Sequence, residues 1–364
     1  MKTLFLGDFS PTADNTHLFL ANDQAALFSD LPSLFADNDV SMVNLECALT
    51  ESEGAIRKIG PALKAPTAAA AVMRELGITH CGLSNNHFFD YGKQGALDSL
   101  RALDAAGIGH TGFGENEADS RRDLVIEKDG ETLCVIAVCE HEYSYALPDR
   151  MGARPFDPFD TPLDVRAAKE KYDRVVVLYH GGKEQCAYPS PRLLKACRTM
   201  AKSGADLILC QHSHCIGCYE QYEGCHILYG QGNFHFVKLA YSSDPGWNDC
   251  LGVSYDTKAN TVQFTPITVN GKNGMRLCNA EESAAIMAEF RARNKELASG
   301  AWLDGWRAFC ESKRESYTRA VTKACVEEFG ESAVQKFGHY LDCEAHQDVW
   351  RELFPTYNQS NEKD

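Results

Sequence analysis

The feature that most constrains this chain is a set of six polar segments, each of which follows a short apolar run. They are Gly7-Asp8, Asn44-Leu45-Glu46, Ser84-Asn85-Asn86-His87, His180-Gly181-Gly182, Gln211-His212-Ser213-His214 and Gly230-Gln231-Gly232-Asn233-Phe234. Parallel strands deliver their carboxyl ends to one edge of a sheet, which is where α/β proteins bind ligands. Carboxylate, amide and imidazole groups meeting at such an edge predict a hydrolytic metal centre.

The apolar runs themselves predict a largely parallel α/β fold. The expected strands are residues 3–6, 40–44, 80–83, 133–139, 175–179, 207–210 and 226–229, most of them continuously apolar as buried strands are. Helical patterns at 67–76 and 191–203 close at Gly77 and Gly204 and lead into the next strand, which indicates parallel crossovers. Residues 251–269 alternate and carry turn residues, so we expect antiparallel strands that finish a second sheet.

The pattern changes after the alternating segment, and this change sets the expected domains. Residues 281–353 are rich in Ala, Glu, Lys and Arg with aromatics at helical intervals, which predicts several amphipathic helices. We therefore expect a main domain at 1–272, a helical region at 273–357 and a polar tail at 358–364. The aromatics are expected in a core, and the helices could cap the rim of the site or form a homodimer surface.

Composition narrows the classes of partner. The 36 Lys and Arg against 51 Asp and Glu give a net charge of −15, which disfavours binding to nucleic acid or to an anionic membrane surface. No stretch approaches the roughly 18 to 20 apolar residues that a membrane span needs. The short apolar N-terminus and the 15 cysteines favour a reducing, cytoplasmic location.

Four cysteines surround the paired histidines and offer an alternative site. Cys210, Cys215 and Cys218 have gaps similar to a plant-type iron–sulfur motif, and Cys225 follows. Cys210 should lie inside a strand and the fourth cysteine is not at the motif's position, so buried thiols are the favoured interpretation.

The paired histidines are the most specific signal for a metal. His212 and His214 are two residues apart, so in an extended segment both imidazoles point to the same side. His180 ends another apolar strand, and Asn86 and His87 end a third. Asp8 and Glu46 are weaker signals individually, because each could be a turn, a helix N-cap or a solvated strand end.

The ordered set of motifs resembles the CapA family of poly-γ-glutamate capsule synthesis proteins, within the calcineurin-like metallophosphoesterase superfamily. The resemblance covers roughly residues 1–236. Besides the six segments, it includes Gly60-Pro61-Ala62-Leu63-Lys64-Ala65, Asp90-Tyr91-Gly92, Glu184, Tyr188-Pro189-Ser190-Pro191 and Gly204-Ala205-Asp206. It implies a four-layer αββα sandwich, with a helical C-terminal extension beyond it.

The resemblance also implies two divalent metal ions and a role for each motif residue. Asp8 would bind the first metal, Glu46 would bridge, Asn86, His180 and His212 would hold the second, His214 would return to the first, and His87 would be the general acid. The donor set favours Mn, Fe or Zn. Ser10 stands where the superfamily has a histidine, so the first site would bind weakly, take a water instead or stay empty; His17 is one conceivable substitute.

Further residues are candidates for substrate contact or support. Asn85, Glu140, His141 and Glu184 follow strand ends, and Lys64, Lys183 and Arg192 are the nearest cations by motif position. Each could instead be an ordinary loop or surface residue. Asn233 is expected to orient a histidine ligand, although it could belong to a simple tight turn.

The leading functional hypothesis is a metal-dependent hydrolase of a phosphoester, monoester or diester, associated with capsule or poly-γ-glutamate metabolism. In it, His87 protonates the leaving group while activated water attacks. A rival from another class is a non-hydrolytic accessory protein that binds an anionic polymer such as poly-γ-glutamate. A third hypothesis is hydrolysis of a γ-glutamyl amide at the same centre.

Overall fold

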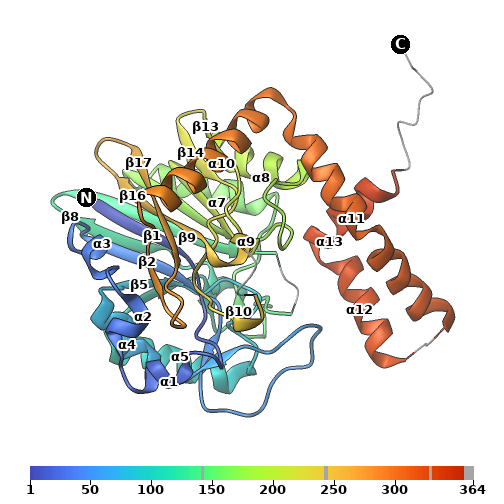
Figure 1. The fold of residues 1–364 in the computed structure, drawn as a ribbon, viewed down its shortest axis with the longest axis horizontal. Coiled ribbons are helices and arrows are strands. Elements are labelled where there is room, and N and C mark those ends of the chain that lie inside the picture. Colours follow the sequence, from blue (N-terminus) through green and yellow to red (C-terminus); the bar gives the residue numbers. More distant parts are fainter. Residues whose placement is uncertain (141–142, 242–244, 328–329, 356–364) are drawn as a thin grey trace.

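The computed structural model describes residues 1–140, 143–241, 245–327 and 330–355 of the chain (Figure 1). The α/β class and the helical C-terminal region are confirmed. The expected tail at 358–364 lies outside the described residues. Within the described ranges, no helix is long and apolar enough to cross a membrane.

One sheet is built around the N-terminal strand. Its order is β18 (Met275–Leu277), β17 (Thr261–Val269), β16 (Cys250–Asp256), β1 (Lys2–Phe9), β2 (Val40–Leu45), β5 (His80–Gly82) and β6 (Gly109–Thr111), and β15 (Asn233–His235) pairs with the end of β1. The pairs β1–β2, β2–β5 and β5–β6 are parallel. The sequence predicts the first three of these strands and a crossover into β5, whereas β6 was not predicted. Their carboxyl ends therefore share one edge.

The second sheet holds the later apolar runs. Its order is β13 (Tyr219–Tyr222), β14 (Cys225–Leu228), β12 (Leu207–Gln211), β11 (Arg174–His180), β9 (Glu131–Cys139) and β8 (Leu124–Lys128). The four central strands are parallel, and β8 and β13 are antiparallel edges. Two short pairs complete the strands: β3 (Ala48–Leu49) with β4 (Lys64–Ala65), and β7 (Phe113–Gly114) with β10 (Gly152–Ala153).

The strands at 251–269 are antiparallel as expected, but they extend the first sheet and not a second one. β15 already pairs with the end of β1, so the chain re-enters along the same edge, and β16 continues it with Phe5 opposite Val253. The prediction of their sheet was wrong because alternation shows that a strand has one solvated face, not which neighbour it has.

The helices N-terminal to β16 lie between the strands in sequence. They are α1 (Thr16–Leu20), α2 (Gln24–Phe28), α3 (Pro32–Ala36), α4 (Ala69–Leu76), α5 (Gly92–Ala105), α6 (Glu117–Ser120), α7 (Asp160–Lys169), α8 (Pro191–Lys202), η1 (Leu239–Tyr241) and α9 (Pro245–Asn248). α4 ends at Gly77, whose φ of +112° is left-handed. Ser190 caps α8 by accepting a hydrogen bond from the Leu193 backbone N–H (3.0 Å), with Pro191 in the first turn.

The C-terminal helices are α10 (Ala280–Ser299), α11 (Trp302–Thr322), the π-helical turn η2 (Lys323–Glu327), α12 (Glu331–Asp342) and α13 (Glu344–Leu353) (Figure 1). α10 begins with a capping box, in which Asn279 and Glu282 satisfy each other's backbone N–H groups, and ends at Gly300. Phe290 packs with the core between the sheets, Trp306 joins the cluster on the outer face of the second sheet, and Tyr317 packs against Tyr340 and Trp350 of the C-terminal helices. These aromatics are core residues, as expected.

Three apolar clusters hold the fold together. Side chains of the first sheet, such as Phe5 and Met42, meet Val176 and Leu209 of the second sheet between the two. A second cluster covers the outer face of the first sheet with α1 to α5, and a third covers the outer face of the second sheet with α7, α8, α11 and α13. The two sheets are thus fixed face to face, and their polar strand ends can meet.

Candidate metal centre

Two carboxylates come from the first sheet. Asp8 lies near the end of β1 and Glu46 directly follows β2, and both are buried. Asp8 accepts hydrogen bonds from the Asn44 side chain (2.7 Å) and from the His212 backbone N–H (3.1 Å). A Cβ atom at Gly7 would lie 1.9 Å from the Gly232 carbonyl oxygen, so only glycine allows this approach of the two segments.

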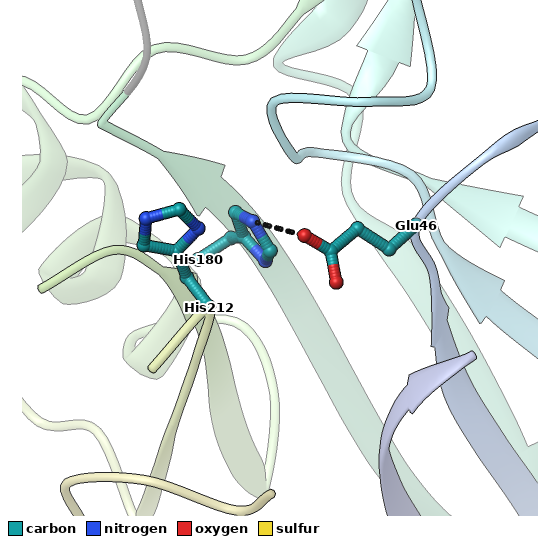
Figure 2. A group of neighbouring side chains, drawn as sticks. All are labelled: Glu46, His180 and His212. Atoms are coloured by element: carbon teal, nitrogen blue, oxygen red, sulfur yellow. Dashed lines mark ion pairs between the residues drawn. The ribbon is translucent and has the colours of Figure 1, made fainter. Parts of the chain in front are cut away.

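Three imidazoles come from the second sheet. His180 ends β11, and His212 and His214 follow β12 with φ angles of +83° and +54°. Left-handed backbone is uncommon for a residue with a side chain, and such strain concentrates at functional sites. Figure 2 shows Glu46 reaching from the first sheet toward His180 and His212, with His180 Nε2 lying 3.4 Å from Glu46 Oε1.

These side chains form two overlapping groups that could each hold a metal ion. Glu46, His180 and His212 form one group, and Asp8, Glu46 and His214 form the other, with the donor atoms of each group within 4.8 Å of one another. A third set, Glu184, His212 and His214, is equally close but includes the exposed Glu184 and lacks Glu46. The side-chain amide oxygen of Asn86, Oδ1, lies 2.9 Å from His180 Nε2 and joins the first group. Glu46 belongs to both groups, which is the position of a bridging ligand.

The environment of Glu46 fits a bound cation. Both of its carboxylate oxygens are buried, and among the described residues neither accepts a hydrogen bond. Leaving a carboxylate buried without donors costs several kcal/mol in general, and a coordinated metal removes that cost. The donor set of carboxylate, amide and imidazole groups is also one that divalent transition metals prefer.

The charges around the centre shift the pKa values of His212 and His214 in opposite directions. Burial and the neighbouring His180 and His214 hold the pKa of His212 well below its usual value, so its ring is neutral, the form that binds metal. Burial opposes charge on His214, but the carboxylates of Glu46 and Asp8 outweigh it and raise its pKa to about 9. Burial opposes ionisation of Asp8 as well, yet His214, His180 and Asn44 lower its pKa.

His87 lies beside these groups and is held by two buried charges. Its Nδ1 is 2.6 Å from Asp90 Oδ2, and the Lys58 ammonium is 2.6 Å from Asp90 Oδ1. Burial and the Lys58 charge lower the pKa of His87, while Asp90 opposes them. Because Asp90 accepts from one ring nitrogen, Nε2 is the nitrogen left to exchange a proton with a ligand.

The structure places the three residues that the sequence analysis linked to the site of Asp8 and His214. Ser10 is buried and its backbone N–H donates to the His235 carbonyl oxygen (3.0 Å). His17 lies on α1 and is exposed, and it belongs to neither metal-holding group. Asn233 lies 2.9 Å from His214 Nδ1 and donates to the Trp247 carbonyl oxygen (2.9 Å), so it is placed to orient His214.

Several other predicted residues lie outside the cluster. Asn85 is buried and donates to Leu45 and Asn44, so it fastens the 84–88 segment to β2. Lys64 donates to the Ser52 carbonyl oxygen and the Glu53 carboxylate and does not line the pocket described below. His141 lies outside the described residues.

Glu140 and Arg192 belong to a buried charge network and do not line the pocket. Glu140 accepts from the Gly182 backbone N–H (2.9 Å), bonds the Tyr179 hydroxyl and pairs with Arg192 (2.5 Å). A Cβ atom at Gly181 would lie 2.5 Å from Glu140 Oε2, so the glycine makes room for this carboxylate. The network therefore supports the backbone that follows His180.

The four cysteines near the paired histidines are buried separately. Cys210 Sγ lies 3.7 Å from Cys197 Sγ, Cys218 donates to the Ala187 carbonyl oxygen, and Cys225 donates to that of His226. Burial raises the pKa of Cys218 to about 12, which keeps this thiol protonated. Buried thiols are thus what the structure contains at these positions.

A pocket of about 320 Å³ opens beside His212 and His87. Its lining comprises Lys58, Ile59, Gly60, Pro61, Asn86, His87, Tyr143, Lys183, Glu184, His212, Lys336, His339, Tyr340, Cys343, Ala345 and His346. Glu184, predicted as a substrate contact, is among them. Lys58 and the individual residues of α12 and α13 were not predicted, because no motif marks them. The sequence indicated only that the C-terminal helices could cap the rim of the site.

Comparisons with known proteins match the chain to capsule synthesis proteins. Residues 2–238 match the family described as bacterial capsule synthesis protein PGA_cap. The chain is 26% identical over 251 residues to the capsule biosynthesis protein CapA of Bacillus anthracis, covering 66% of this chain and 59% of that protein. It is 30% identical over 208 residues to the PGA biosynthesis protein CapA of Bacillus subtilis, covering 55% and 53%.

A third relative is a probable polyglutamine synthesis accessory protein of Mycobacterium tuberculosis, 29% identical over 210 residues, with 54% of this chain and 55% of that protein covered. The matches therefore span little more than half the length of these relatives. The family match, in contrast, takes in well over half of the present chain and every residue of the two metal-holding groups. The chain belongs to the bacterial capsule synthesis protein PGA_cap family.

Proposed function

We propose that this protein is a metal-dependent hydrolase of a phosphoester. The observation that carries the proposal is the pair of metal-holding groups that share Glu46, with His87 beside them in the same pocket. A bridging carboxylate between two imidazole-containing groups is the arrangement that two-metal hydrolases use.

In this proposal two divalent ions, Mn, Fe or Zn, are held by the chain's own donors. Asp8, Glu46 and His214 hold one, and Glu46, Asn86, His180 and His212 hold the other. Such ions supply Lewis acidity, charge neutralisation and an activated water for an in-line displacement. Asn44 and Asn233 orient Asp8 and His214 for this role.

His87 is the proton donor in this scheme. Asp90 fixes the ring through Nδ1, so Nε2 can carry the proton that the leaving oxygen takes. Burial and Lys58 lower the pKa of His87, which makes its imidazolium a stronger acid. Lys58 pairs with Asp90 through a buried contact of 2.6 Å, and both side chains position His87.

The substrate is proposed to be anionic and connected with capsule or poly-γ-glutamate metabolism. The names of the relatives support this association. The chain's net charge of −15 disfavours polyanions at most of its surface, so recognition has to come from the metals and from local lysines.

A second candidate is an accessory protein that binds an anionic polymer without cleaving it. The name of the Mycobacterium tuberculosis relative favours this alternative. Hydrolysis of a γ-glutamyl amide at the same centre is a third candidate, since an activated water can attack either bond.

The test is hydrolysis of 4-nitrophenyl phosphate and bis(4-nitrophenyl) phosphate by purified protein loaded with Mn²⁺. We expect His87→Gln to lower kcat about 10²- to 10⁴-fold, the usual contribution of a positioned general acid. His17→Gln is the matched control, because His17 is exposed on α1 and belongs to neither metal-holding group. It should leave kcat and the metal content unchanged.

The alternatives predict different results. Metal-loaded protein that cleaves neither ester, with His87→Gln indistinguishable from the parent, would refute the phosphoesterase proposal. Binding of a γ-linked glutamate oligomer without cleavage would then support the accessory role. Release of glutamate from that oligomer would support the amide hydrolase.

A further inference from the structure

The pocket over the metal centre is completed by helices outside the family match. The family match ends at residue 238, whereas Lys336, His339 and Tyr340 of α12 line the pocket. Ala345 and His346 of α13 line it too. Part of the wall that a substrate meets is therefore built by the C-terminal helices of this chain.

These helices are held in place by buried contacts. Asp348 of α13 accepts a hydrogen bond from the Ser190 hydroxyl (2.6 Å) and pairs with Arg192 (2.9 Å), both at the start of α8. Val349 and Leu353 pack into the cluster that contains Trp306 on the outer face of the second sheet. α13 thus packs on the core. α12 packs against α13 and also lines the pocket.

The wall carries positive charge in an acidic protein. Lys183 lies in the segment after β11 with a side chain that is 10% exposed, and Lys336 of α12 is exposed. Burial, aided by the positive charges of Lys183 and Lys336, lowers the pKa of His346 to about 2, so this lining imidazole is neutral. The lysines therefore supply the positive charge on this side of the pocket.

Nearby carboxylates leave much of this charge available. Lys183 Nζ is 3.7 Å from Glu184, whose side chain is half exposed and so screened by solvent. Lys336 Nζ lies 5.6 Å from the centre of the Tyr340 ring, a cation–π contact that orients it without neutralising it. Lys58 differs, because it forms a buried pair with Asp90.

We propose that Lys336, together with Lys183, binds a second anionic group of the substrate while the scissile phosphoester lies at the metal centre. This inference rests on the proposed function and names its substrate class: a small molecule or chain end with a carboxylate or phosphate beyond the scissile group. A pocket of about 320 Å³ suits such a ligand, because small-molecule sites begin at about 300 Å³. Lysine ammonium groups accept either anion as point charges.

The test compares substrates that differ in the distal charge. Phenyl phosphate and 4-carboxyphenyl phosphate are hydrolysed by the Mn²⁺-loaded full chain and by its Lys336→Gln variant. The preference of each protein is its kcat/KM for 4-carboxyphenyl phosphate divided by its kcat/KM for phenyl phosphate. The carboxylate changes the leaving group equally in both proteins, so the ratio of the two preferences isolates the contact with Lys336. We expect the preference for the carboxylated ester to fall about three- to tenfold, through KM.

A matched control and a second variant guard against indirect effects. Lys295→Gln changes an exposed lysine on α10, which contributes no residue to the pocket, and should leave the preference unchanged. Lys183→Gln should lower the preference in the same direction as Lys336→Gln. Equal thermal midpoints of variants and parent exclude unfolding as the cause.

Binding measurements separate this inference from the proposed function. Phenylphosphonate, 4-carboxyphenylphosphonate and 1,4-phenylenebisphosphonate cannot be hydrolysed, and calorimetry on the Mn²⁺-loaded protein gives their affinities. Tighter binding of the two doubly charged probes, lost in Lys336→Gln, supports the inference even if no ester is cleaved. Equal affinity of the parent protein for all three probes, or a preference that Lys336→Gln keeps, would overturn it.

Discussion

The contact between Asp348 and α8 makes a quantitative prediction about pH and stability. Asp348 is buried with a side chain that is 4% exposed, and Arg192, its cationic partner, is shared with Glu140. Arg192 therefore faces two carboxylates, while Arg351, 3.5 Å from Asp348, is mostly exposed and its charge is screened by solvent. Asp348→Asn keeps the size of the side chain and its carbonyl acceptor while removing the second negative charge.

The magnitude follows from the shift of the Asp348 pKa. Burial raises it, and Glu140 adds to this, so that despite Arg192 and Ser190 the pKa moves from 3.8 to about 6. The folded state then holds a proton that the unfolded state has lost, so stability falls as pH rises from about 4 to about 6. A difference of roughly two pKa units corresponds to about 3 kcal/mol.

Urea unfolding of both proteins between pH 4.5 and 7.5, followed by tryptophan fluorescence, measures this effect. Between pH 4.5 and 7.5 we expect Asp348→Asn to gain about 2 kcal/mol of stability relative to the parent, because at pH 4.5 the unfolded carboxyl has already lost most of its proton. Asp304→Asn, at an exposed position on α11, should show a profile parallel to that of the parent. Parallel profiles for Asp348→Asn as well would refute the argument from one shared guanidinium.

Two further predictions concern metal and backbone. Mn²⁺ at about a hundredfold excess over its Kd should stabilise the protein by about 3 kcal/mol and raise Tm by several degrees, an effect that EDTA reverses and His212→Ala weakens; a Tm that ignores Mn²⁺ would contradict the metal centre. Gly181→Ala should cost about 1 to 3 kcal/mol in urea unfolding, because its Cβ would collide with Glu140. Gly338→Ala on α12, where a Cβ meets nothing within 4 Å, should instead gain about 0.5 to 1 kcal/mol, and equal effects of the two substitutions would show that the collision is relieved at little cost.

The ligand cluster was predictable because it depends on local pattern. A continuously apolar run marks a buried strand, and the first polar residues after it mark the strand end, as at His180 after β11 and Glu46 after β2. Parallel pairing then brings such ends to one edge without knowledge of any distant contact. Residues 1–214 therefore carried most of the information about the centre.

The pocket and its supporting charges depend on pairings that pattern does not encode. Glu140 and Arg192 look like rim residues in sequence, yet Asp348, more than 150 residues beyond Arg192, draws that arginine into a buried network. Lys336 and His339 lie in a helix whose spacing predicts only amphipathicity. The sequence left open whether the C-terminal helices cap the site or form a homodimer surface, and the structure shows α12 lining the pocket.

Ser10 connects the prediction of a missing ligand with the number of donors around Asp8. The resemblance implies that a histidine is missing there, and the structure buries Ser10 without bringing His17 to the centre. The group of Asp8, Glu46 and His214 thus offers three side chains, whereas Glu46, Asn86, His180 and His212 offer four. Affinity rises with the number of donors, so the smaller group should lose its ion first on purification. An assay without added metal would then measure protein with only one metal site filled. A lack of activity in that assay would not test the protein with both sites filled.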